Sequence, residues 1–216
     1  NTTSGFGIYK RTGTATAGTI AHGLGDVPKF IISKNISSNT NVKCYHSHLG
    51  NTKCINLNET NSKETNSMWN DTTPTDTVYS VGSNNDGNKS GDTYIDYVFC
   101  EKRGFSKMLS WEGGVQPNFL YCGFRPQFLL CKASNSNSEN WALYDDKREG
   151  YNPQNDRMFP NNATQEADEA LIDFVSNGIT LRDTSNGHIS YSGHGYIGVA
   201  FGQTLVGSNN TPCTAR

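Results

Sequence analysis

One strand-like segment occurs twice in this sequence of 216 residues, and it constrains the fold more than any other feature. The first copy is residues 90–99, SGDTYIDYVF, and the second is residues 192–201, SGHGYIGVAF. Each begins with a Ser-Gly turn and continues with apolar side chains at alternate positions, the pattern of a β-strand with one buried face. The chain therefore has to bury the same kind of sheet face twice.

Other segments match at nearly the same offset. The apolar run at residues 28–34, PKFIISK, corresponds to residues 126–132, PQFLLCK, and Gly5-Phe6 corresponds to Gly104-Phe105. A period of this length is too long for a solenoid and suits half of a large sheet protein. We predict two tandem, sequence-similar halves, residues 5–103 and 104–205.

The predicted fold is all-β. No Pro-, Ser- or Gly-rich linker separates the halves, and each half would leave sheet edges open unless it paired with the other. We therefore expect a single domain over residues 1–206, a two-layer antiparallel β-sandwich of the concanavalin A-like jelly-roll type, with a tail at 207–216. One short helix is expected at 163–175, where apolar residues have helical spacing behind acidic ones.

Composition excludes several classes of function. The chain has 18 Lys and Arg against 20 Asp and Glu, a net charge of -2, so it lacks the basic footprint of a nucleic-acid-binding protein. No stretch approaches the roughly 20 apolar residues of a membrane-spanning helix. The cysteines lack a CxxC spacing, and we expect buried thiols, with a Cys44–Cys54 bridge between neighbouring strands as the open alternative.

Motifs for catalysis and cofactors are weak. Residues 193–198 fit GxGxxG, but a strand rather than a helix follows, so no dinucleotide site and no cofactor is expected. His46 and His48 lack an acidic or Cys partner at metal-ligand spacing, and we expect no metal site. Asp92 and Asp96, and Asp145-Asp146, do not form the E-x-D-x-x-E array of paired acids that glycoside hydrolysis uses. Asp96 corresponds to Gly198 in the second half and fits a solvent-facing strand position. We expect no catalytic residues.

The tryptophans offer the one binding hypothesis. Trp141 lies in a strand-like run and is expected in the core. Trp69 and Trp111 lie in or next to polar loops, where an indole ring can stack on a sugar while Asn and Asp side chains bind its hydroxyls. They are the glycan-stacking candidates, with the alternative that each covers an edge of the sandwich.

The sequence resembles an uncharacterised repeat family of tailed-phage virion proteins, found in tail and fibre proteins. Features that carry the resemblance cover nearly the whole chain: Gly5-Phe6, His22-Gly23-Leu24-Gly25, Trp69-Asn70, residues 90–99, Gly104-Phe105-Ser106-Lys107, residues 123–126, Trp141, Tyr151-Asn152-Pro153, Asp173-Phe174 and Ser192-Gly193. The resemblance implies a lectin-like β-sandwich on a virus particle and no catalytic residues. The loop at 139–154 is longer and more charged than its first-half counterpart and departs from the pattern.

These observations predict a non-enzymatic structural and attachment module of a phage virion, in a tail, a fibre or a surface decoration. Expected partners are other virion proteins, further copies of the chain and a cell-surface glycan, without nucleic acid and without membrane insertion. The alternative is a carbohydrate-binding module of a secreted or surface protein that has no virion role. A glycan-cleaving enzyme ranks third.

Overall fold

The computed structural model describes residues 1–114, 118–148 and 150–203, so the predicted tail at 207–216 lies outside the described residues. The chain divides into two compact units, Asn1–Glu101 and Lys102–Arg216. All strand pairs between the named strands are antiparallel, which confirms the all-β prediction. Neither helix of the described part is long and apolar enough to cross a membrane.

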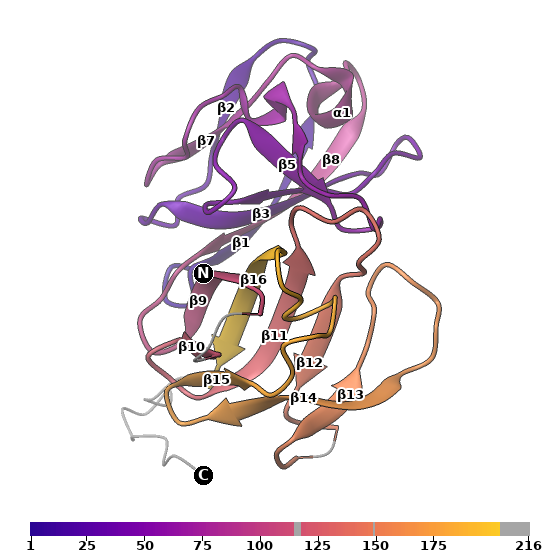
Figure 1. Cartoon of the computed structure of the whole chain (residues 1–216). Coiled ribbons are helices and arrows are strands. Elements are labelled where there is room, and N and C mark those ends of the chain that lie inside the picture. Colours follow the sequence, from indigo (N-terminus) through magenta and orange to yellow (C-terminus); the bar gives the residue numbers. More distant parts are fainter. Residues whose placement is uncertain (115–117, 149, 204–216) are drawn as a thin grey trace. The chain divides into compact units, whose positions relative to one another are not determined.

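The first unit contains a six-stranded sheet and a two-stranded one (Figure 1). The six-stranded sheet has the order β1 (Phe6–Thr12), β8 (Thr93–Cys100), β3 (Pro28–Asn35), β4 (Lys43–His46), β5 (Lys53–Asn56), β6 (Glu64–Thr65). The smaller sheet pairs β2 (Gly18–Ala21) with β7 (Val78–Val81), and two single-turn helices follow β6 and β7, η1 (Ser67–Trp69) and α1 (Asn85–Asn88).

Apolar side chains at alternate positions of the strands form the core of the first unit. Ile31 of β3, Tyr45 of β4 and Val98 of β8 lie on one face of the large sheet and are buried. Tyr79 of β7 and Trp69 of η1 cover this face and pack against these three side chains. Burial of such apolar surface stabilises a fold by about 25 cal/mol per Å².

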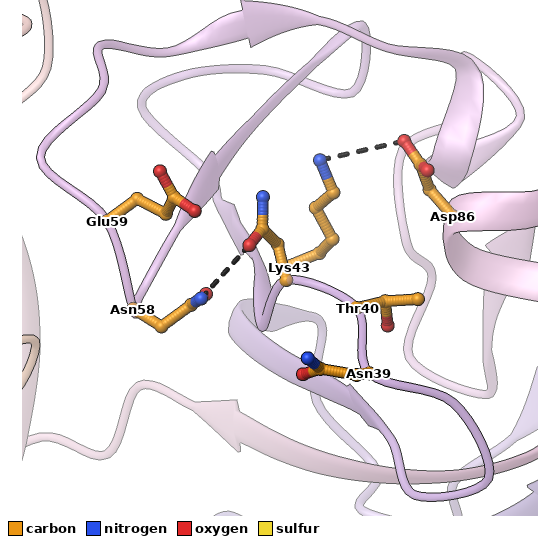
Figure 2. A pocket seen from close by; sticks show the side chains of 7 residues that line it. Asn39, Thr40, Lys43, Asn58, Glu59 and Asp86 are labelled. Atoms are coloured by element: carbon orange, nitrogen blue, oxygen red, sulfur yellow. Dashed lines mark hydrogen bonds and ion pairs between the residues drawn. The ribbon is translucent and has the colours of Figure 1, made fainter.

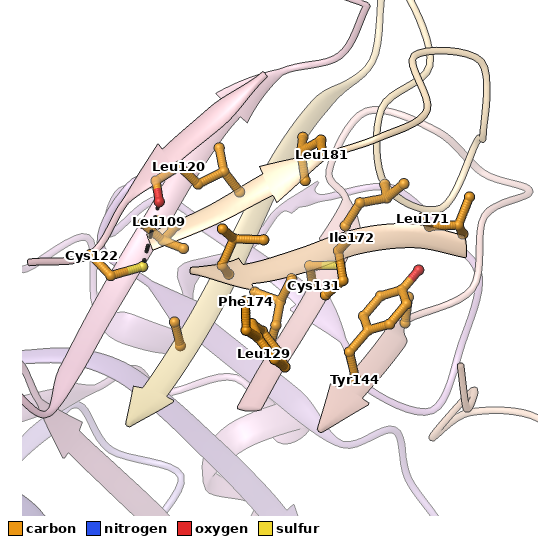
Figure 3. Packing of buried hydrophobic residues seen from close by; sticks show 14 of the residues in the cluster. Leu109, Leu120, Cys122, Leu129, Cys131, Tyr144, Leu171, Ile172, Phe174 and Leu181 are labelled. Atoms are coloured by element: carbon orange, nitrogen blue, oxygen red, sulfur yellow. Dashed lines mark hydrogen bonds between the residues drawn. The ribbon is translucent and has the colours of Figure 1, made fainter. Parts of the chain in front are cut away.

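The second unit consists of two four-stranded sheets. One has the order β12 (Ala142–Asp145), β11 (Pro126–Ala133), β16 (Gly195–Gly202), β9 (Ser106–Glu112), and the other β10 (Phe119–Tyr121), β15 (Gly178–Leu181), β14 (Ala167–Val175), β13 (Gln154–Arg157). Figure 3 shows the apolar side chains between them, including Leu129 and Tyr144 from the first sheet and Phe174 from the second. This unit is a two-layer sandwich with its own core.

The large sheets of the two units share one strand order. In the first unit β1, β8, β3 and β4 are neighbours in that order, and in the second β9, β16, β11 and β12 are. Registers agree as well, because Phe99 lies opposite Phe30 and Phe201 lies opposite Phe128. The repeated segments at 90–99 and 192–201 thus form the end of a turn and the central strand of each sheet.

A buried tyrosine hydroxyl anchors the turn before each central strand. The Tyr94 hydroxyl accepts a hydrogen bond from the Lys89 backbone N–H at 2.9 Å. The Tyr196 hydroxyl accepts one from the Tyr191 backbone N–H at 2.8 Å. In both units the ring at the start of the strand therefore fixes the backbone five residues earlier.

Two expectations about the fold are wrong. Within the described residues, every pair of named strands joins strands of the same unit, so the halves do not complete one sandwich by interleaving. Each unit instead covers its large sheet with a second sheet of its own. The helix expected at 163–175 is the strand β14, in which Ile172 lies opposite Leu181 and Phe174 opposite Ile179.

The five cysteines of the described residues are buried and form no disulfide with one another: Cys44, Cys54, Cys100, Cys122 and Cys131. Burial raises the pKa of the Cys54 and Cys122 thiols to about 12, so they are protonated at neutral pH. Cys44 lies opposite Ile55, so Cys54 is on the other face of the sheet, and the alternative Cys44–Cys54 bridge is wrong.

Asp96 is fully buried in the first unit, contrary to the solvent-facing position expected for it. Its carboxylate accepts hydrogen bonds from Arg11 Nε at 2.6 Å, Ser33 Oγ at 2.5 Å and Tyr79 Oη at 2.6 Å. Burial, followed by the Asp96 charge, raises the pKa of Tyr79, which keeps the hydroxyl protonated as a donor. A buried carboxylate needs such partners, because its desolvation alone is costly.

At the equivalent positions the second unit packs an aromatic ring where the first unit has the Arg11–Asp96 ion pair. The Arg11 guanidinium lies 4.2 Å above the Tyr94 ring, and the Trp111 ring stacks on the Tyr196 ring with centroids 5.3 Å apart. Gly198 replaces the aspartate, and a Cβ there would lie 3.0 Å from the Trp111 ring. The indole thus fills the volume that the ion pair occupies in the first unit.

The ion pair gives a test of this packing. Asp96→Asn should destabilise the first unit by about 3–5 kcal/mol, because it leaves the Arg11 charge buried without compensation. The double variant Arg11→Met/Asp96→Asn should cost clearly less than the sum of the two single replacements. Denaturant unfolding of the four proteins measures this, and additive costs would contradict the coupling.

Candidate functional site

A polar hollow of about 470 Å³ lies in the first unit (Figure 2). Its lining comes from three separate stretches of the chain: the β3–β4 loop with the start of β4, the segment after β5, and α1. The lining residues are Asn39, Thr40, Asn41, Lys43, Asn58, Glu59 and Asp86. The volume falls within the roughly 300–1,000 Å³ typical of small-molecule pockets, although those are usually more apolar.

Local hydrogen bonds hold one rim of the hollow in place. Asn58 Oδ1 accepts from the Val42 backbone N–H at 2.8 Å, and Asn58 Nδ2 donates to Asn41 Oδ1 at 3.0 Å. The Leu57 N–H donates to the Val42 carbonyl at 2.8 Å, which continues the β4–β5 pairing beyond the strands. The rim is therefore built on a hairpin, which positions its amide groups.

Lys43 forms the base of the hollow. Its side chain is only 7% exposed, and its Nζ lies 2.5 Å from Glu64 Oε1 and 3.6 Å from Asp86 Oδ2. Asn66 Nδ2 donates to Asp86 Oδ2 at 3.1 Å and to Glu64 Oε1 at 3.4 Å, so one amide joins both carboxylates. The Cys54 thiol donates to the same Glu64 oxygen at 3.2 Å.

This arrangement shifts the pKa values of both Lys43 and Glu64. Burial works against the charge of Lys43, but the hydrogen bond with Glu64 and nearby negative charge raise its pKa overall. Burial also works against the charge of Glu64, while hydrogen bonds from Lys43 and Cys54 hold its pKa below the ordinary value. Both groups are therefore charged at neutral pH, and each neutralises the other.

The chemistry available in the hollow is polar recognition. Asn39, Asn41 and Asn58 carry amide donors and acceptors, and Glu59 and Asp86 carry acceptors. The Thr40 hydroxyl oxygen is buried and has no hydrogen-bond partner within the described residues. Such groups match the hydroxyls of a sugar or another polyol.

The two predicted stacking residues lie elsewhere. Trp69 is 2% exposed and belongs to the core of the first unit, where its ring meets Tyr45 edge-on. Trp111 is partly buried against the core of the second unit, and its Nε1 donates to the Ile189 carbonyl at 2.8 Å. Trp69 is therefore a core residue and does not cover an edge of the sheet. Trp111 packs from the edge strand β9 against the core of the second unit, and Trp141 is buried as predicted.

The described residues contain no group of three or more His, Cys, Asp or Glu side chains arranged to hold a metal ion. His46 is fully buried, with its ring 5.5 Å from that of His48.

Residues 1–204 match the family described as "Domain of unknown function (DUF7483)". The chain belongs to this family. Among curated proteins no match was found. Among solved structures there was likewise no match.

The DUF7483 match includes the whole first unit and the second unit through its last described residues. The polar hollow and the buried Asp96 network both lie within it. Since the family carries no described function, any role for the hollow has to be argued from its own geometry.

The Lys43–Glu64 pair predicts how the first unit responds to pH. Because folding lowers the pKa of Glu64, the pair's stabilisation is present above the unfolded value near 4.3 and is lost as pH falls through the folded pKa. Between pH 5 and pH 3 the wild type should therefore lose more stability than Glu64→Gln. The difference should be below about 1 kcal/mol, since the carboxylate is partly exposed. Denaturant unfolding at several pH values checks this, and parallel pH profiles would contradict it.

Proposed function

We propose that this chain is a non-enzymatic attachment module on a phage particle and that it binds a cell-surface glycan through the polar hollow. The hollow carries this proposal: seven polar side chains, amides and carboxylates among them, surround a space of about 470 Å³. The resemblance to tailed-phage virion proteins supplies the particle setting. The asparagine- and threonine-rich composition suits a surface exposed to water.

Binding fits the hollow better than cleavage does. A glycosidase acid needs a raised pKa so that it holds a proton for the leaving group. Hydrogen bonds from Lys43 and Cys54 instead lower the pKa of Glu64, the most extensively bonded carboxylate at this site. Glu64 therefore serves as a hydrogen-bond acceptor in the Lys43 ion pair.

We also propose that the two units are tandem copies of one lectin-like sandwich module. The shared strand order, the matching Phe–Phe registers and the paired tyrosine anchors support this relation. Divergence at the Arg11–Asp96 and Trp111–Gly198 positions accounts for part of the sequence difference. In this proposal the hollow described above belongs to the first copy.

An attachment module gains avidity when several copies meet a surface together. We therefore propose that the chain works as a homo-oligomer beside other virion proteins, outside the host cell and away from nucleic acid and the membrane interior. Detection of the chain in purified particles by mass spectrometry and immunogold labelling tests the virion setting. Glycan binding by a chain that is absent from particles would favour a carbohydrate-binding module without a virion role.

A glycan array tests the binding site. The wild-type chain should bind one class of bacterial surface glycan, and Asn39→Ala/Thr40→Ala should weaken that binding about tenfold or more, by the loss of about 1.4 kcal/mol of polar contacts. The matched control Thr3→Ala/Asn177→Ala removes the same side-chain types at exposed positions away from the hollow and should bind as the wild type does.

Trp69→Phe is a second control, since a core residue should affect stability and leave the glycan profile unchanged. Binding to no glycan, or equal binding by the hollow variant and the wild type, would contradict the proposed site. Thermal unfolding of each variant shows whether it is folded.

A further inference from the structure

We infer that the hollow selects saccharides that carry a free amino group. This inference rests on the proposed glycan binding and names the class of sugar. Its basis is the charge balance around Lys43, together with the polar groups that surround the space.

Negative charge exceeds positive charge at this site. Lys43 is the one basic residue among the seven that line the hollow in the described structure, whereas Glu59 and Asp86 are both acidic. Glu64 lies beside Lys43 and forms its closest ion pair, at 2.5 Å. Two carboxylates thus line the hollow with one lysine, and the ammonium of that lysine is already paired with Glu64. Lys34, whose Nζ donates to the Thr40 carbonyl at 3.1 Å, adds one further positive charge beside the lining, so the three carboxylates still exceed the two ammonium groups.

Acidic sugars do not fit this balance. Recognition of a uronate or another carboxylated sugar requires a cationic or strongly donating group that is free to bind it. Lys43 is already engaged by Glu64 and lies 3.6 Å from Asp86. An acidic ligand would face repulsion from Glu59 and Asp86, while the Lys43 ammonium is held by Glu64 and the Lys34 ammonium donates to the Thr40 carbonyl at 3.1 Å.

A bare metal ion fits poorly as well. A divalent cation would need several carboxylate oxygens to converge on it. The Lys43 ammonium already lies within ion-pair distance of both Glu64 and Asp86, so a metal ion bridging these acids would meet its positive charge. The part of the chain that the structure describes contains no metal-binding group of acidic and soft side chains.

An amino sugar matches both features of the hollow. Its ammonium group has three hydrogen-bond donors and a positive charge. The Glu59 and Asp86 carboxylates can accept those hydrogen bonds and attract that charge. The Asp86 side chain is 53% exposed and so can be reached by a ligand. The amides of Asn39 and Asn41 and the Thr40 hydroxyl line the same space and suit the ring hydroxyls.

Chito-oligosaccharides supply a matched pair of probes, because the de-N-acetylated and N-acetylated forms differ only in the charge and size of the amine substituent. Titration calorimetry of the full chain near pH 6 should show at least about tenfold tighter binding of the de-N-acetylated form. The preference should shrink as ionic strength rises, since the attraction is between partly exposed charges.

Two variants assign the preference to the hollow. Glu59→Gln and Asp86→Asn should each reduce the ratio of the two affinities by about three- to tenfold. Asp76→Asn is the control, because it removes one negative charge at an exposed position that does not line the hollow. It should leave the ratio unchanged. If Asp86→Asn disturbs α1, a reduced affinity ratio in Glu59→Gln alone assigns the preference to the hollow.

The outcomes separate this inference from the proposed function. Equal affinity for the two forms, with binding still lost in Asn39→Ala/Thr40→Ala, would overturn the amine selectivity and leave glycan binding at the hollow intact. Tighter binding of oligoglucuronate than of the de-N-acetylated probe would also overturn the selectivity. If neither these probes nor any glycan on the array binds, both proposals fail.

Discussion

The central strand of each large sheet, β8 or β16, is hydrogen-bonded along both of its edges, and this constraint decides which side chains reach the core. Neighbours on both sides fix the register, and a slip by one residue would turn every core residue outward. In β8 the fixed face brings Asp96 inward, so the fold has to supply Arg11 and Tyr79 as partners. In β16 the same face carries Gly198, and an indole ring takes the space.

The hollow depends on a second constraint, the ion pair between Lys43 and Glu64. Because this pair satisfies the lysine within the protein, the positive charge at the base of the hollow is not free for a ligand. Under the proposal that the hollow binds an amino sugar, the Glu59 and Asp86 carboxylates select the ligand. A buried charge whose partner is fixed can therefore set the selectivity of a site without contacting the ligand.

Much of the fold could be predicted from sequence, because alternation marks strands with one buried face. The repeated segments and the apolar runs at 28–34 and 126–132 form strands close to the expected places. The segment at 163–175 was misassigned because apolar residues at 170, 171 and 174 also fit a helix, and only pairing with β15 decides for a strand. Interleaving of the halves could not be judged, since sequence does not show which sheet covers which.

The candidate site was harder to predict. Glu59 and Asp86 lie apart from Lys43 in sequence, in polar segments that are typical of loops and turns, whereas Lys43 begins the strand β4. A tryptophan in a polar segment favours sugar stacking, yet Trp69 follows a capping Asn66 and belongs to a buried helical turn. The sequence around Asp96 does not indicate its burial, because its partner Arg11 is 85 residues away.

The most direct measurement of the central claim is chemical-shift mapping of the full chain during titration with the de-N-acetylated chito-oligosaccharide. The account predicts that the perturbed amides cluster at residues 39–43, 58–59 and 84–88, with the largest side-chain carboxyl shifts at Glu59 and Asp86. Perturbations concentrated in the second unit, or around Trp111, would contradict it.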